Sequence, residues 1–170
     1  NIAGTTAALR LDGSAAAVEL PDTLVLTLSN PSNEGALVNE AGDNVIAGDL
    51  LLGAAVGGSR ITLAAGSLRI GGIIRNTYTS RGLETAGAGD AQFDGGLDNG
   101  GVGLSLNGYT KNGSGTVRIP GPVNIAGGIT HNAGRLVLNG PVALGGSLSV
   151  ASGAVLTGYG TVRAPTTISG

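Results

Sequence analysis

GTVRIPGPVNIAGGITHNA, residues 115–133, is followed directly by GRLVLNGPVALGGSLSVAS, residues 134–152, and the two stretches match wherever a strand or a corner would constrain the residue. The apolar matches pair Val117 with Leu136, Ile119 with Leu138, Val123 with Val142, Ile125 with Leu144 and Ile129 with Leu148. Each stretch holds three short apolar segments separated by Gly or Pro corners. This pattern predicts one turn of a coil for each copy.

A third copy begins at Gly153 and reads GAVLTGYGTVRAPTTISG. One extra residue in the Gly158-Tyr159-Gly160 turn brings Val155, Val162 and Ile168 near the corresponding places. We therefore expect the coil to continue to the last residues of the chain.

The segments have strand periodicity, because apolar and small polar residues alternate over three to five positions, as in Val117-Arg118-Ile119. A unit of this size cannot bury its apolar face alone, so neighbouring units must stack, with equivalent residues about 4.8 Å apart. The sequence predicts an all-β chain folded as a parallel β-helix, or β-solenoid, of roughly eight coils of about 19–22 residues. Residues 14–20, which contain three alanines, leave a helical turn open as a local alternative.

Composition agrees with a thin solenoid. Glycine supplies 33 of the 170 residues, and the only aromatic residues are Tyr78, Phe93, Tyr109 and Tyr159, so a core of large rings is not expected.

The formal net charge of −2, with no basic cluster, argues against nucleic-acid binding. The chain has no cysteine, which excludes disulfides and thiolate metal sites and is compatible with export. No apolar run is long enough for a membrane-spanning helix.

The whole chain, residues 1–170, reads as a single solenoid domain with one interruption. In RNTYTSRGLETAGAGDAQFDGGLDNGG, residues 75–101, branched apolar residues are few and Gly and Asp are frequent, which predicts a loop or protruding insertion. The first and last residues resemble strands and turns rather than polar caps. We therefore expect the chain to be part of a longer chain or of a stack that associates end to end.

Residues 107–140 resemble the autotransporter-associated β-strand repeat, whose pattern joins a Lys-x-Gly-x-Gly turn, short strands, an Asn-Ala-Gly turn and a closing Asn-Gly. The matching positions are Lys111, Gly113, Gly115, Val117, Ile119, Gly127, Gly128, Asn132, Ala133, Gly134, Leu136, Leu138, Asn139 and Gly140. The resemblance extends over about residues 37–74 and 105–165. The chain departs from the family at Gly121-Pro122-Val123, where the family's aromatic corner is missing, and in the length of residues 75–101.

The resemblance implies a right-handed parallel β-helix that is secreted or displayed on a bacterial cell surface. It implies no catalytic residues.

Candidate chemical groups are few. The single histidine, His131, lies beside the Asn132-Ala133-Gly134 turn at the position equivalent to Val150, and we interpret it as a turn residue. Asp90, Asp94 and Asp98 form the only acidic cluster; a solvated loop is the plain interpretation, and a calcium site is the functional one because flexible, oxygen-rich loops suit that cation. Catalysis by these carboxylates, as in polysaccharide-active β-helix enzymes, is a remote alternative.

The sequence offers no aromatic platform for a sugar, since Tyr109 and Tyr159 stand in Gly-rich turns and are expected to fill corners. Asn107, Asn132 and Asn139, each near a glycine, are expected in turns or in a ladder of stacked amides.

Two functional hypotheses follow. In the first, the chain is a structural extracellular stalk or filament segment without catalytic activity. In the second, it is an adhesin whose residues 75–101 contact a surface glycan, a host protein or calcium.

Overall fold

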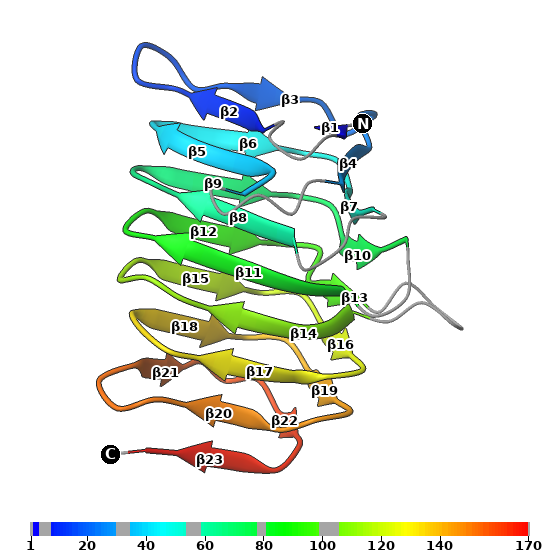
Figure 1. Cartoon of the computed structure of the whole chain (residues 1–170), viewed down its shortest axis with the longest axis vertical. Coiled ribbons are helices and arrows are strands. Elements are labelled where there is room, and N and C mark those ends of the chain that lie inside the picture. The colour runs from blue at the N-terminus through cyan, green and yellow to red at the C-terminus, as the bar shows by residue number, and fades with distance from the viewer. Residues whose placement is uncertain are drawn as a thin grey trace.

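The computed structural model describes residues 2–3, 8–29, 35–53, 59–77, 81–98 and 106–169, and this part of the chain forms strands and turns without a helix. Three parallel sheets surround one interior, and each strand pairs with the strand three places later in the chain (Figure 1). Residues 14–20, where a helical turn was an alternative, contain bends followed by a strand. One strand from each sheet makes one coil, so the predicted β-solenoid is confirmed.

Sheet A consists of β1 (Ile2–Ala3), β4 (Leu26–Ser29), β7 (Leu50–Leu52), β10 (Ile74–Asn76), β13 (Leu97–Asp98), β16 (Val123–Ile125), β19 (Val142–Leu144) and β22 (Val162–Arg163). Sheet B consists of β2 (Leu9–Asp12), β5 (Leu37–Ala41), β8 (Ser59–Leu63), β11 (Arg81–Gly87), β14 (Leu106–Lys111), β17 (Gly128–His131), β20 (Leu148–Val150) and β23 (Thr166–Ile168). Sheet C consists of β3 (Glu19–Leu20), β6 (Asp43–Ile46), β9 (Ser67–Ile70), β12 (Asp90–Phe93), β15 (Thr116–Ile119), β18 (Arg135–Leu138) and β21 (Val155–Thr157). The number of coils is therefore slightly below the expected eight.

The register of the repeat is as predicted. The structure pairs Val117 with Leu136, Ile119 with Leu138, Val123 with Val142, Ile125 with Leu144 and Ile129 with Leu148. In the third copy, Val162 pairs with Val142 and Ile168 with Val150, but Leu156, and not Val155, lies on Leu136. Val155 instead continues the position of Arg135, on the outer face.

Coil length changes along the chain. Leu97 pairs with Val123, which is 26 residues later, whereas Val123 pairs with Val142, which is 19 residues later. The expected 19–22 residues is therefore wrong for the N-terminal coils, which are longer. The difference lies mainly at the corner between sheets A and B, where seven residues separate β13 from β14 and two separate β16 from β17.

The prediction that residues 75–101 form a loop or insertion is wrong for the described residues. Arg81–Gly87, Asp90–Phe93 and Leu97–Asp98 are the strands β11, β12 and β13, and each pairs with both neighbouring coils. Residues 78–80 and 99–101 lie outside the described residues. Its described residues form the strands of a coil, and the buried apolar side chains among them are few: Leu83, Ala91, Phe93 and Leu97.

Inward side chains of successive coils form columns, such as Leu68, Ala91, Val117 and Leu136 in sheet C. Burying one leucine-sized side chain contributes about 1.5 to 3 kcal/mol, and the sum over the columns opposes the entropy of ordering the chain. Corners between sheets B and C depend on glycine. At Gly66, φ is +67°, and an added Cβ would lie 2.1 Å from the carbonyl oxygen of Gly42 in the preceding coil.

Candidate functional site

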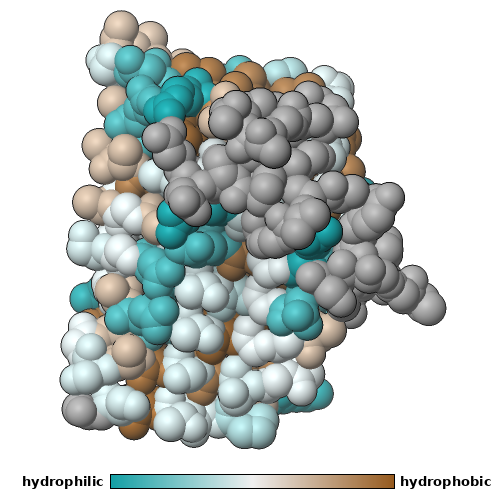
Figure 2. Space-filling model, in the orientation of Figure 1, coloured by the Kyte–Doolittle hydropathy of each residue, from teal (hydrophilic) through white to brown (hydrophobic). Residues whose placement is uncertain are grey.

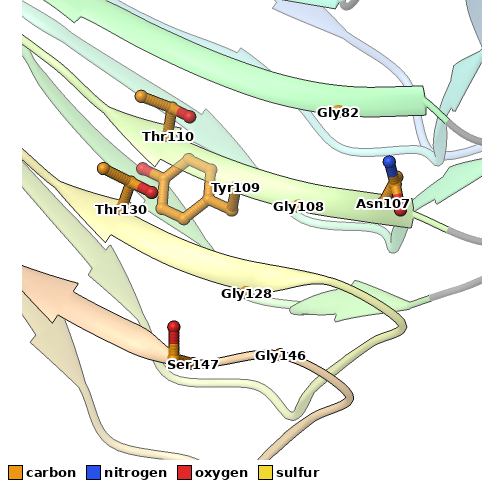
Figure 3. A pocket seen from close by; sticks show the side chains of 9 residues that line it. All are labelled: Gly82, Asn107, Gly108, Tyr109, Thr110, Gly128, Thr130, Gly146 and Ser147. Atoms are coloured by element: carbon orange, nitrogen blue, oxygen red, sulfur yellow. The ribbon is translucent and has the colours of Figure 1, made fainter. Parts of the chain in front are cut away.

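A groove of about 500 Å³ lies on the outer face of sheet B, in its C-terminal half (Figure 3). The described residues that line it come from β11, β14, β17 and the corner before β20: Gly82, Asn107, Gly108, Tyr109, Thr110, Gly128, Thr130, Gly146 and Ser147. The groove crosses the strands, so it runs along the axis of the solenoid. A ligand lying in it would meet one coil after another.

The floor of the groove is a stack of glycines. Gly82 pairs with Gly108 and Gly108 pairs with Gly128 in neighbouring strands. The register shifts beside this stack, because Arg81 pairs with Leu106 while Gly82 pairs with Gly108, leaving Asn107 as an extra residue. Such bulges redirect a side chain, and Asn107 is exposed at the edge of the groove (Figure 3).

The backbone does not require glycine at position 82. A Cβ added there would lie 3.6 Å from the nearest atom, the carbonyl oxygen of Gly108, which is ordinary van der Waals contact. A glycine inside a strand costs roughly 0.5–1 kcal/mol relative to alanine. The missing side chain therefore leaves the groove open at a position where a larger residue would fit the strand.

The polar side chains around the groove are uncharged: the hydroxyls of Thr110, Thr130 and Ser147 and the amide of Asn107. Figure 2 shows this lower part of the face as mostly pale. The N-terminal half of sheet B differs, since Arg10 Nη1 lies 2.5 Å from Glu40 Oε1 and Arg60 Nη2 lies 2.5 Å from Glu84 Oε1. The groove can thus donate and accept hydrogen bonds without favouring either sign of charge.

An amide ladder lies beside the groove. Asn132 Nδ2 donates to Asn112 Oδ1 at 2.8 Å, and Asn112 Nδ2 donates to Glu84 Oε1 at 2.7 Å. The expected role of Asn132 in a stacked amide ladder is confirmed. The hydrogen bonds from Asn112 and Arg60 lower the pKa of Glu84 against the opposing effect of its burial, which is the largest single influence.

Behind the groove, the interior of sheet B includes polar groups among its apolar side chains. Tyr109 is buried, and its hydroxyl lies 2.8 Å from Thr85 Oγ1. The expectation that Tyr109 fills a corner is wrong, because Tyr109 is an interior residue of β14, whereas Tyr159 lies between β21 and β22 and is exposed. Burial raises the pKa of Tyr109 far above its ordinary value, so the phenol stays protonated.

Lys111 is buried at the end of β14 and points to the corner between sheets B and C. Its Nζ donates to the carbonyl oxygens of Asn112 at 3.0 Å, Gly113 at 2.7 Å and Ala133 at 3.1 Å. Three acceptors use all three hydrogens of an ammonium group. Burial lowers the pKa of Lys111, and Asp90 opposes that effect. The hydrogen bond to Ala133 ties one coil to the next.

His131 lies on Lys111 in the same column, one coil later, and is fully buried. It is the last residue of β17 and faces the interior, so its interpretation as a turn residue is wrong. Its equivalence to Val150, visible in the repeat, is confirmed, and that match to an apolar residue is the signal that could have identified a buried position. Nε2 lies 3.1 Å from the carbonyl oxygen of Val155, in the next coil, and Nδ1 is buried with no hydrogen-bond partner.

The structure does not bring the three candidate calcium ligands together. Asp90 begins β12, where its Oδ1 accepts a hydrogen bond of 2.7 Å from the backbone nitrogen of Thr116. Asp94 follows β12, with Oδ2 2.6 Å from Arg69 Nε and Oδ1 2.7 Å from Gln92 Nε2. Asp98 ends β13, in sheet A. Within the described ranges, no three His, Cys, Asp or Glu side chains form a group that could hold a metal ion.

In the same part of the chain, no helix is long and apolar enough to cross a membrane. No protein-family model, curated protein or solved structure matches this chain.

Proposed function

We propose that the chain is a non-catalytic structural segment of an extracellular bacterial surface protein, a stiff β-solenoid that spaces or presents other parts of a larger assembly. The observation that carries this proposal is the unbroken pairing of each described coil with its neighbours, from β1 to β23, including the stretch expected to be a loop. In such an architecture each coil contacts only the next, so length and stiffness follow from the number of coils.

The resemblance to the autotransporter-associated repeat supports the surface location, and the absence of cysteine is compatible with it. A non-catalytic role is supported by the carboxylates of Asp90 and Asp94, which are engaged by Thr116, Arg69 and Gln92.

Lengthening the solenoid tests the structural role. Inserting three more copies of residues 134–152 after Ser152 should add about 14 Å to the longest dimension measured by small-angle scattering, about 4.8 Å for each coil. A chain that aggregates or keeps its original length would contradict the proposal. A matched screen on polysaccharides completes the test, since cleavage that is lost in Asp90→Ala or Asp94→Ala would establish an enzyme instead.

End-to-end association belongs to the same proposal. Ile168 in β23 continues the column of the buried residues His131 and Val150 and is itself 68% exposed. Parallel strands with unpaired edges favour addition of a further coil. Sedimentation across a concentration series should reveal head-to-tail oligomers that Ile168→Lys weakens; a monomer at all concentrations would remove this part of the proposal.

A second candidate function is adhesion through the groove on sheet B, with a neutral polyhydroxylated ligand such as a surface glycan. The observation that favours it is the open glycine floor at Gly82, a residue of the stretch that the sequence assigned to adhesion. The replacement Gly82→Thr should fill the groove and abolish binding of neutral oligosaccharides without loss of stability. The control is Ala143→Thr, on the exposed face of sheet A. Equal binding of oligosaccharides by both variants would exclude the groove as the binding site.

A further inference from the structure

We infer that His131 is an acid-sensitive link between two coils. Protonation of its Nδ1 in mild acid opens the coil of β19, β20 and β21 away from the coil of β16, β17 and β18.

The geometry of the link fixes the protonation state of the ring. The carbonyl oxygen of Val155 can only accept, so Nε2, at 3.1 Å, carries the hydrogen. In the neutral ring Nδ1 is then an acceptor, and it is buried without a partner. Protonation would add a charge at a buried atom, which is costly, and the backbone carbonyl groups of Lys111 and Gly134 offset that cost only in part.

The groups around His131 offer no compensating negative charge. From β14, Lys111 faces it as an ammonium held by three carbonyl oxygens, and a second positive charge beside it would be repelled. From β20, the paired residue is Val150, and β21 contributes the carbonyl oxygen of Val155. The buried side chains of β17 and β18 are aliphatic: Ile129, Leu136 and Leu138. Asp90 raises the pKa of Lys111 but is not among the groups that shift the pKa of His131.

The direction of the pH effect follows from linkage. Burial is the main cause that lowers the pKa of His131 in the folded chain below its ordinary value of 6.5. The opened state therefore takes up the proton first as the pH falls. The contribution of the link is fully present above pH about 6.5 and decreases as the pH falls toward the pKa of the folded state. Each unit by which that pKa is lowered raises the opening equilibrium about tenfold.

A similar link between two earlier coils is made by an amide, which does not titrate, and serves as a control. In the N-terminal part, Asn39 Nδ2 donates to the carbonyl oxygen of Ala65 at 2.8 Å, which also ties the end of a sheet B strand to the corner of the next coil. An amide keeps its donor at every pH of interest. Acid should therefore affect the coils on either side of His131 and spare those joined by Asn39.

Hydrogen exchange followed by mass spectrometry at pH 7 and pH 5, after correction for the intrinsic rate, tests the inference on the whole chain. We expect opening of β17, β20 and β21 to increase severalfold at pH 5, while β5 and β8 change by less than about twofold. An equal increase in both regions, or none, would overturn the inference.

Two variants separate the charge from the packing. In His131→Gln an amide can still donate to Val155, and in His131→Val the side chain matches Val150 of the next coil. Both should remove the difference between pH 7 and pH 5. If either folded variant keeps it, another group is responsible and the inference fails. Should neither variant fold, the ring resonances of His131 in the natural chain decide: titration below pH 6.5 supports the link, and titration at or above 6.5 overturns it.

Discussion

The coils before β14 and those after it share one interior plan but differ at a single corner and on one face. Between sheets A and B, four to seven residues connect β4 to β5, β7 to β8, β10 to β11 and β13 to β14, whereas two or three connect the later pairs. The outer face of sheet B carries ion pairs in the earlier coils and uncharged hydroxyls and glycines in the later ones. Parallel pairing therefore constrains the strands and leaves the corner and the outer face free to vary.

The largest change in the free energy of unfolding should come from a core substitution within residues 75–101, the coil whose sequence resembles a loop. Phe93 is fully buried in β12, so Phe93→Ala should lower the free energy of unfolding by about 3–5 kcal/mol, measured by urea denaturation. Leu136→Ala, in a later coil, is the matched control, with an expected loss of about 2–5 kcal/mol. A loss below about 1 kcal/mol for Phe93→Ala alone would show that the two regions do not share one core.

The loop interpretation of residues 75–101 failed for a physical reason. Interior positions that Leu68 and Ile61 fill in the preceding coil are occupied there by Ala91 and Thr85, which do not give the apolar alternation of a strand. Thr85 is suitable because the hydroxyl of Tyr109 lies beside it, a partner one coil away that local periodicity cannot reveal. By contrast, the repeat at residues 115–152 predicted the strand register of the later coils, since equivalent residues of two successive copies must pair.

Two glycines that look alike in the sequence should respond differently. Gly66→Ala places a Cβ at positive φ and 2.1 Å from the carbonyl oxygen of Gly42, so we expect a loss of about 2–3 kcal/mol. Gly82→Ala meets nothing closer than 3.6 Å and should be neutral or stabilise by up to about 1 kcal/mol. Thermal denaturation of both variants measures the difference. Similar losses would mean that Gly82 is also required by the backbone.

Thr85, Lys111 and His131 stack in one column of buried polar side chains in the middle of sheet B. Replacing Lys111 by Met keeps the volume but leaves carbonyl oxygens of Asn112, Gly113 and Ala133 without their donor, at an expected cost of about 1–3 kcal/mol at pH 7. Because burial lowers the pKa of Lys111, the unfolded chain takes up the proton first, and the free energy of unfolding of the natural chain decreases as the pH falls below about 10.4. Urea denaturation at pH 8 and pH 10.5 should show a smaller pH dependence in Lys111→Met. An unchanged or higher stability at pH 7 would mean that the ammonium contributes no net stabilisation.

The candidate site was less predictable than the fold. Its floor depends on a bulge at Asn107 that brings Gly82 and Gly108 into one row, and a bulge is a property of two paired strands. The buried roles of Lys111 and His131 likewise depend on carbonyl oxygens of Ala133 and Val155, in the following coils. In the sequence, only the match of His131 with Val150 indicated that one of these side chains is buried. Side chains whose partners lie one coil away can be placed only after the register is known.

The smallest effect should come from the corner that separates the two regions. Ala126 and Gly127 alone connect β16 to β17, which shows that two residues can join sheet A to sheet B. Replacing residues 99–105 by Ala-Gly should therefore change the free energy of unfolding by no more than about 1 kcal/mol, since each halving of a flexible connection recovers only about 0.6 kcal/mol of closure entropy. Urea denaturation of the shortened chain measures this change. A loss of several kcal/mol would show that the seven residues stabilise the earlier coils, and the length of this corner would then be part of the fold.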